Sequence, residues 1–262
     1  MKLLLGKKIL ITGIISKLSI AYGIAKAMYN NKAELIFTYH KEKNKKRVEK
    51  LVKNMTNYPI IKCNVSKDNN IKSLFIKLSQ FWSKFHGFIH SIAFVPKNQL
   101  KGSFIDNTSR KGFQIAHDIS SYSLTAMVKE CRNMLYPQSA IVSLSYLGSN
   151  RVVPNYNVMG LAKASLEANI RYIAYDIGKQ NIRINGISSS PIKTLSSSGI
   201  NNLNNIIKYY NNMTPLSYTI TINDIGNVAV FLCSDLSCGI TGEIIHVDGG
   251  FNLITMNENL KF

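Results

Sequence analysis

Cysteine and proline are scarce in this chain, with 4 and 6 copies among 262 residues. The four thiols form no C-x-x-C pair, and the step from Cys233 to Cys238 does not suit a zinc pair. The histidines also lack metal-ligand spacing, so we expect no metal site. Few, scattered and buried thiols are typical of a reducing compartment, and we expect a cytoplasmic protein.

Acidic residues and long apolar runs are scarce as well. There are 14 Asp and Glu against 32 Lys and Arg, a net charge of +18. Such a surface could bind nucleic acid, an anionic membrane or an acidic protein. Biased base composition is the simpler explanation, because Asn and Ile are also abundant, as in residues 201–207. No apolar run reaches the length of a membrane span, so we expect no membrane insertion.

Strand-like and helix-like segments alternate along the chain. Its length and 45% hydrophobic composition suffice for one sizeable core, and we expect a single domain over residues 1–262. The alternation predicts an α/β fold, a Rossmann-type doubly wound parallel sheet with helices on both faces. Predicted strands are 8–12, 34–39, 60–64, 87–90, 140–145, 183–188 and 243–247; predicted helices are 20–30, one from about 43, 70–85, one ending near 135, and 157–178.

The most informative stretch is residues 145–169, SYLGSNRVVPNYNVMGLAKASLEAN. Tyr156 and Lys163 fall at the start of a predicted long helix, with Asn157 as its expected N-cap. At about 100° per residue, the two side chains return to nearly the same helix face two turns apart. A phenol and an ammonium on one face suggest a proton donor assisted by a fixed positive charge. Tyr146 supplies a second phenol just upstream.

This stretch resembles the short-chain dehydrogenase/reductase superfamily, which ordinarily uses Y-x-x-x-K on one helix. Gly160 stands where that motif needs its lysine. The wider Y-x6-K spacing, with Y-L-G upstream, is similar to a divergent branch, the NADH-dependent bacterial enoyl-acyl-carrier-protein reductases. The resemblance extends over essentially the whole chain, through TGIISKLSIAYGIAKA, HSIAF, AHDISSYS, SSSPIKTLSSSGI and GITGEIIHVDGGF.

The resemblance implies NADH-dependent reduction of the trans-2 double bond of enoyl thioesters on acyl carrier protein, the last step of the type II fatty acid elongation cycle. Tyr156 would stabilise the enolate, Lys163 would bind the nicotinamide ribose, Tyr146 would line the site and Val95 would contact the substrate. The wider spacing moves the phenol about 4.5 Å along the helix axis relative to the lysine. That suits an oxygen two bonds beyond the carbon that accepts hydride.

The resemblance also implies a dinucleotide site at the ends of the first strands. Gly13 can turn without side-chain hindrance, and the helix after Ser19 offers N–H groups to a pyrophosphate. A substrate-binding loop and helices are expected at about 192–215. The other expected cofactor contacts are Ile20, His40, Asn64, Val65, Ile92, Lys163, Ile192, Lys193, Thr194, Leu195 and Ser196.

The end of the second strand bears on the choice between NADH and NADPH. No acid precedes Glu42 there, and His40 occupies a position where NADH-using relatives often have a neutral residue. The lysines between Lys41 and Lys46 could bind a 2′-phosphate, although lysine is abundant throughout the chain. We expect NADH to be preferred and NADPH to be tolerated.

The expected partners are an acyl carrier protein and further copies of this chain. Relatives are homotetramers whose interfaces include the long catalytic helices, and Ala162, Ala164, Ser165 and Ala168 are small enough for close helix contact. These small side chains could equally pack on the sheet.

Two other functions remain open. A ketoreductase or alcohol dehydrogenase of the same superfamily would need Y-x-x-x-K, which is missing at Gly160. The formal match from Tyr22 to Lys26 lies in the first predicted helix, and Ser143 is expected to be a strand residue. A non-catalytic nucleic-acid-binding protein is suggested only by charge, and we expect no nucleic-acid partner.

Overall fold

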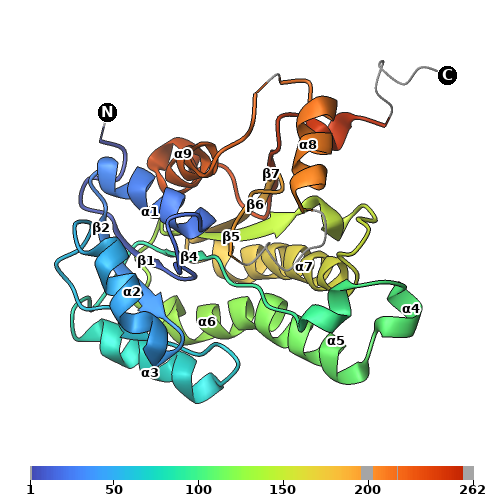
Figure 1. The fold of residues 1–262 in the computed structure, drawn as a ribbon. Helices are drawn as coiled ribbons and strands as arrows, with labels where there is room; N and C mark the ends of the chain where they lie inside the picture. The colour runs from blue at the N-terminus through green and yellow to red at the C-terminus, as the bar shows by residue number, and fades with distance from the viewer. Residues whose placement is uncertain (1, 196–202, 217, 256–262) are drawn as a thin grey trace.

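The computed structural model describes residues 2–195, 203–216 and 218–255. Its core is a seven-stranded sheet in the order β3-β2-β1-β4-β5-β6-β7, and every neighbouring pair of strands is parallel (Figure 1). The predicted fold class is therefore confirmed. The strands are β1 Lys8–Ile11, β2 Glu34–Tyr39, β3 Ile61–Lys62, β4 Phe88–His90, β5 Ala140–Tyr146, β6 Arg183–Ser189 and β7 Ile244–Val247.

Helices cover both faces of the sheet because each presents an apolar stripe to it. One buried cluster joins the sheet to α3, α6 and α7, and a second joins it to α1, α2 and α9. Figure 1 shows α6 and α7 on one side of the strands and α9 on the other. The helices are α1 Ile20–Asn30, α2 Glu42–Val52, α3 Asp68–Ser79, α4 Phe104–Asn107, α5 Arg110–His117, α6 Ser123–Cys131, α7 Val158–Gly178, α8 Leu203–Met213 and α9 Ile222–Cys233.

The strand order reverses at β1, which pairs with β2 on one side and with β4 on the other. In open α/β sheets, ligands bind in the crevice outside the carboxyl ends of the strands at such a reversal. The segments that follow β1, β2, β3 and β4 therefore mark the place where a nucleotide is expected.

Among the predicted elements that are shorter in the structure, the third strand and the helix predicted at 70–85 differ most. The third strand covers only Ile61–Lys62, because it lies at the sheet edge and pairs with β2 alone. The predicted helix 70–85 is instead α3, which ends at Ser79. Trp82 and Phe85 are fully buried from the irregular chain that follows, so their apolar character reflects core packing rather than a helix face.

Two sequence-based expectations concern the thiols and the membrane. Cys63, Cys131 and Cys233 are buried, but Cys238 is exposed, so the expectation of burial is wrong for Cys238. Within the described residues, no helix is both long and apolar enough to cross a membrane.

Candidate active site

The loop after β1 lies against the start of the loop after β4. Gly13 has a φ of +86°, and a Cβ there would lie 1.9 Å from the carbonyl oxygen of Ser91. Thr12 Oγ1 donates to the Ile89 oxygen at 2.9 Å and accepts from the Ser91 nitrogen at 3.2 Å. Only glycine fits this close approach, which holds the ends of β1 and β4 together at the reversal of strand order.

Ser19 closes the loop that leads into α1. Its Oγ accepts from the backbone nitrogens of Ile15 at 3.2 Å and Ser16 at 3.1 Å. Ile20 is the first residue of α1, and the first N–H groups of a helix have no acceptor within it. A glycine turn, a closed loop and a helix N-terminus together suit the diphosphate of a dinucleotide.

Three of the predicted cofactor contacts, His40, Asn64 and Val65, follow the ends of β2 and β3. The side chain of Asn64 interacts with His40, and Val65, which follows Asn64 in the chain, is buried. Burial, and then the charge of Lys41, lower the pKa of His40, so its imidazole is neutral at pH 7. Asn64 Oδ1 also accepts from the backbone nitrogen of Ser66 at 3.2 Å.

Lys163 is buried, with 5% of its surface exposed, and lies behind the end of β5. Its Nζ donates to the carbonyl oxygen of Leu144 at 2.6 Å. Burial lowers the pKa of Lys163 to about 8, and the carboxylate of Glu167 opposes this shift. The ammonium form therefore still predominates at pH 7.

The two phenols lie in contact, with the rings of Tyr146 and Tyr156 edge to face and their centroids 4.9 Å apart. Burial is the main cause that raises the pKa of each phenol. Both groups therefore keep their protons at neutral pH and can act as hydrogen-bond donors.

Tyr156 reaches this place through a turn rather than through the long helix. The helix α7 begins at Val158, and both Asn155 and Asn157 have positive φ, 62° and 40°. Asn157 occupies the predicted N-cap position, but its side chain donates to the Gly102 oxygen at 3.3 Å and makes no cap bond. The predicted helix and its N-cap position are therefore confirmed, but Tyr156 lies before the helix, and the turn with positive φ at Asn155 and Asn157 sets the position of the phenol.

Close packing against the backbone of Gly148 leaves no room for a side chain at position 160. A Cβ at Gly160 would lie 2.7 Å from the carbonyl oxygen of Gly148, and a Cβ at Gly148 would lie 2.5 Å from the ring of Tyr156. A lysine at position 160 would therefore need the backbone to move. The sequence has no lysine at position 160, and the close packing in the structure leaves no room for one.

Val95, the predicted substrate contact, lies in a small apolar cluster beside the phenol. It is buried, and Tyr156 packs against the cluster that contains it. This cluster therefore gives the phenol of Tyr156 an apolar support. Its other members are Leu100, Ala116, Val158, Met159 and Ala162.

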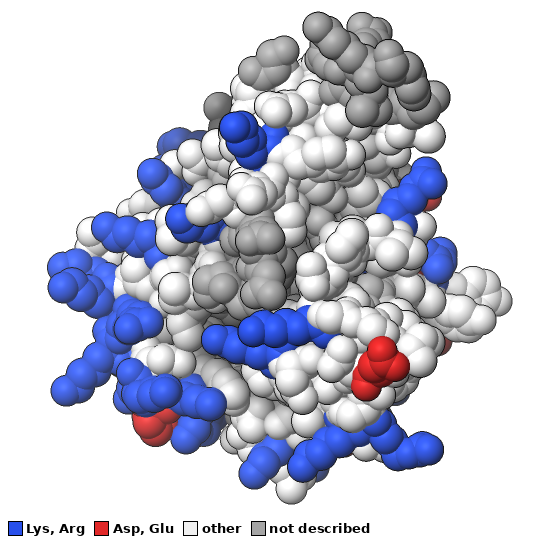
Figure 2. Space-filling view, turned by 45° about the vertical axis from the view of Figure 1, so that its right-hand side comes forward, with Lys and Arg blue, Asp and Glu red and all other residues white. Residues whose placement is uncertain are grey.

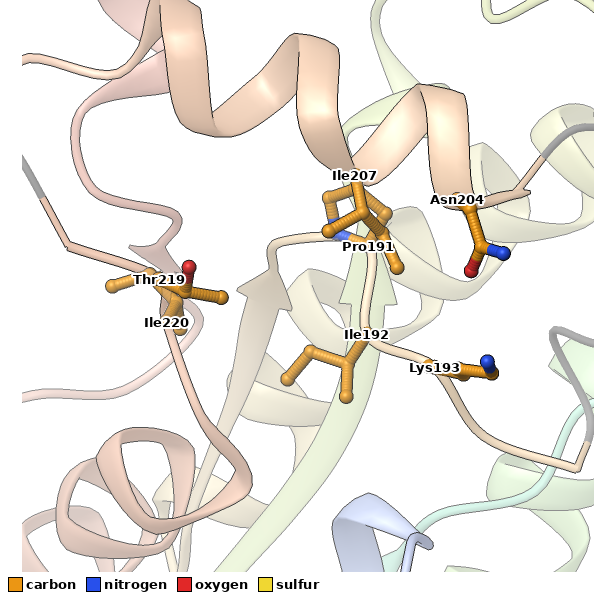
Figure 3. Close-up of a pocket in the computed structure, with 7 residues that line it drawn as sticks. All are labelled: Pro191, Ile192, Lys193, Asn204, Ile207, Thr219 and Ile220. Carbon is orange, nitrogen blue, oxygen red and sulfur yellow. The ribbon is translucent and has the colours of Figure 1, made fainter.

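The segment after β6 lines a cavity of about 290 Å³ beneath α8 (Figure 3). It contains Ile192 and Lys193, both predicted to contact the cofactor. Thr194 and Leu195 follow on the same segment, whereas Ser196 lies outside the described residues. The lining residues come from three segments, namely Pro191, Ile192 and Lys193 after β6, Asn204 and Ile207 on α8, and Thr219 and Ile220 before α9.

Tyr210 on α8 belongs to the site but was not predicted from the sequence. Its hydroxyl lies 2.9 Å from that of Tyr146, and its ring stacks on Phe251 with centroids 3.6 Å apart. The two hydroxyls are 64 residues apart in the chain, and no local pattern connects them. A tyrosine in the predicted substrate-binding region was the only available signal.

His90, the last residue of β4, is buried between β5 and α6, a position that the sequence did not predict. His90 Nδ1 lies 3.1 Å from Ser143 Oγ, and His90 Nε2 lies 2.8 Å from Ser123 Oγ. Burial, followed by the charge of Lys163, lowers the pKa of His90 to about 3. Ser143 is a buried strand residue, as predicted, and serves as one partner of this neutral imidazole.

The helix α7 is also held by a π-helical turn, Asp118–Tyr122, between α5 and α6. Ser121 Oγ lies 2.8 Å from Ser165 Oγ and accepts from Asn169 Nδ2 at 2.7 Å. Ser165, noted above for its small size, thus faces this turn. Among the described residues, no cluster of three or more His, Cys, Asp or Glu could hold a metal ion.

The doubly wound sheet, the dinucleotide loop and the two tyrosines beside the buried Lys163 define a nucleotide-dependent reductase of the short-chain dehydrogenase/reductase class. The family described as enoyl-(acyl carrier protein) reductase matches residues 13–252. The chain belongs to this family.

Close relatives cover nearly the whole chain. The NADH-dependent enoyl-[acyl-carrier-protein] reductase FabI of Buchnera aphidicola from Acyrthosiphon pisum is 57% identical, over 98% of this chain and 99% of the relative. FabI of Escherichia coli K12 is 54% identical, over 98% of both chains. The crystal structure of the Bacillus cereus enoyl-acyl carrier protein reductase with NADP⁺ and indole naphthyridinone superposes with a TM-score of 0.95 at 43% identity, over 98% of this chain and 100% of that one.

Proposed function

We propose that this protein reduces the trans-2 double bond of enoyl thioesters carried on acyl carrier protein, with NADH as the reductant. The observation that carries the proposal is the convergence of Tyr146, Tyr156 and the buried Lys163 at the end of β5. Relatives at 54–57% identity bear the name of this NADH-dependent activity. The steric exclusion at Gly160 separates the site from a Y-x-x-x-K ketoreductase.

The residues of the dinucleotide site fit the proposed cofactor. The Gly13 turn, the Ser19 loop and the N-terminus of α1 would hold the diphosphate, and His40, Asn64 and Val65 would lie at the adenosine end. The remaining contacts would come from Ile20, Ile92, Ile192, Lys193, Thr194, Leu195 and Ser196. When bound, NADH supplies the hydride that the β-carbon of the substrate accepts.

The phenols and the lysine would act on the developing negative charge. Tyr156 would donate a hydrogen bond to the thioester oxygen, and its raised pKa keeps the proton available. Lys163, still protonated at pH 7, would bind the nicotinamide ribose and add positive potential. Tyr146, held by Tyr210, would orient the substrate, whose chain would lie against Val95.

The acyl carrier partner, the assembly and the compartment are part of the same proposal. An acidic carrier would be attracted to the basic surface, where Lys and Arg far outnumber acids on the face in Figure 2. A homotetramer would cover Tyr172 and Tyr175 on α7, which are each 81% exposed in the single chain. A monomeric mass by light scattering at micromolar concentration would overturn the tetramer. We place the enzyme in the cytoplasm.

The decisive experiment follows NADH consumption with a crotonyl thioester and the purified, folded protein. Reduction of the crotonyl thioester is expected, and reduction of an acetoacetyl thioester instead would show a ketoreductase. Lys163→Ala should mainly weaken NADH binding, because the ammonium that binds the ribose is lost. No consumption of NADH by the wild-type protein would overturn the proposed function.

A further inference from the structure

A carboxylate without a part in the mechanism above lies one helical turn beyond Lys163. Glu167 belongs to α7, four residues after the lysine, so the two side chains share a helix face. Glu167 Oε1 accepts a hydrogen bond of 2.5 Å from Ser145 Oγ. Ser145 stands in β5 between Leu144, which accepts from Lys163, and Tyr146.

The helix α7 therefore holds the end of β5 at two consecutive residues. Lys163 contacts the backbone oxygen of Leu144, and Glu167 contacts the hydroxyl of Ser145. On its other edge this part of β5 is aligned with β6, where Ser145 is paired with Ser188. Tyr146 is the next residue of β5, so these two contacts fix the backbone from which its side chain extends.

Glu167 also affects the protonation of Lys163. Lys163 is removed from water by β5, and its desolvation favours the neutral amine. The other titratable group that acts on it is His90 from β4, which is neutral, whereas the nearby phenols of Tyr146 and Tyr156 keep their protons and carry no charge. Among the described residues, Glu167 is the one carboxylate that acts on the charge of Lys163.

We propose that Glu167 is a positioning residue of this reductase, which fixes the end of β5 through Ser145 and supplies the counter-charge of the buried lysine. The inference rests on the proposed function, because it assigns to Lys163 a role that needs the ammonium form. It predicts that geometry and charge can be separated by two different substitutions.

Glu167→Gln keeps an oxygen that can accept from Ser145 but removes the charge. The pH at which NADH affinity is lost on the alkaline side should move down by about one unit, because an uncompensated buried amine loses its proton more readily. Ser145→Ala keeps the charge but removes the tie to β5. Its alkaline limit should stay in place, while kcat falls on the order of tenfold through misplacement of Tyr146.

The matched control is Asp176→Asn, which removes one exposed carboxylate from the same helix. It should leave both the pH profile and kcat at wild-type values. Fluorescence titration with NADH across pH reads the charge effect without turnover, and steady-state kinetics with a crotonyl thioester read the geometric effect.

If the pH dependence of NADH affinity is unchanged in Glu167→Gln, or shifts equally in Asp176→Asn, then Glu167 is not the counter-charge of Lys163. Wild-type kcat in Ser145→Ala would overturn the positioning role, and this variant carries the test if Glu167→Gln does not fold. A wild-type protein that binds NADH but reduces no enoyl thioester would instead refute the proposed function, while the titration would still report on Glu167.

Discussion

The rings of Tyr146 and Tyr156 meet edge to face at an interplanar angle of 70°, although the two residues leave different elements. Tyr146 is the last residue of β5, and Tyr156 lies in the turn before α7. Their surroundings differ, since Tyr146 bonds to Tyr210 while Tyr156 packs on the cluster around Val95. The two phenols are therefore expected to have separable roles.

Removing the hydroxyl of Tyr156 should impair the chemical step. Tyr156→Phe keeps the ring packing but loses the donor to the thioester oxygen, so kcat on carrier-linked substrates should fall about 100-fold, as for loss of one oxyanion donor. The affinity for NADH should change little. Tyr175→Phe, at an exposed tyrosine on α7, is the control. Unchanged turnover in Tyr156→Phe would remove this residue from the mechanism.

Removing the hydroxyl of Tyr210 should affect the substrate rather than the cofactor. Tyr210→Phe keeps the stacking on Phe251 but leaves Tyr146 without this hydroxyl partner. We expect the KM for the thioester to rise about fivefold, which corresponds to one hydrogen bond of about 1 kcal/mol. NADH titration should give the wild-type affinity. A change confined to NADH binding would contradict the placement of Tyr210 at the substrate side.

Two glycines of α7 provide a matched pair for thermal unfolding. Gly160→Ala would place a Cβ 2.7 Å from the Gly148 oxygen and should lower the stability by about 1–3 kcal/mol through overpacking. Gly178→Ala meets nothing within 4 Å and should raise stability by about 0.5–1 kcal/mol, because alanine favours the helix. Equal Tm values for the two variants would show that the contact at Gly160 is not tight.

The buried His90 should make folding sensitive to acid. Its pKa is about 3 in the folded protein and about 6.5 when unfolded, so between these values only the unfolded chain takes up the proton. This contribution to stability is complete above pH 6.5 and is lost at about 1.4 kcal/mol per pH unit as pH falls toward 3.

Urea unfolding at fixed protein concentration tests this expectation. His90→Gln should show a shallower loss of stability between pH 6.5 and pH 4.5 than the wild type. Ser123→Ala removes a hydrogen-bond partner but keeps the imidazole, so it should lower stability without changing the slope. Parallel slopes for the wild type and His90→Gln would mean that another group dominates acid unfolding.

The second strand should favour NADH over NADPH. His40 is neutral at pH 7, and Lys41 is exposed, so its attraction for a 2′-phosphate is weakened by water. Glu42, the next residue, forms an ion pair with Lys62, with 3.0 Å between Oε1 and Nζ. We expect kcat/KM to be higher with NADH, and Lys41→Ala to lower the NADPH value by about two- to fivefold. A much higher value with NADPH, falling selectively in Lys41→Ala, would contradict this preference.

Much of the fold and part of the site could be predicted from local sequence. The bounds of α1 and β2 agree with the predicted ranges, because hydrophobic periodicity and flanking turn residues act over a few positions. Gly13 was predicted through the family resemblance, and its φ of +86° shows the turn for which glycine is suited. The Tyr156–Lys163 spacing identified the family without any coordinates.

Tertiary structure alone decided how the site is assembled. The bonds from Tyr146 to Tyr210 and from Ser145 to Glu167 join residues 64 and 22 positions apart, and no periodic pattern encodes such pairs. The turn that places Tyr156 before α7 depends on residues with positive φ and on close packing against Gly148, and no helical periodicity predicts either of them. Local preferences set which element a residue joins, whereas its partners depend on how the sheet and α7 pack together, because that packing brings distant side chains into contact.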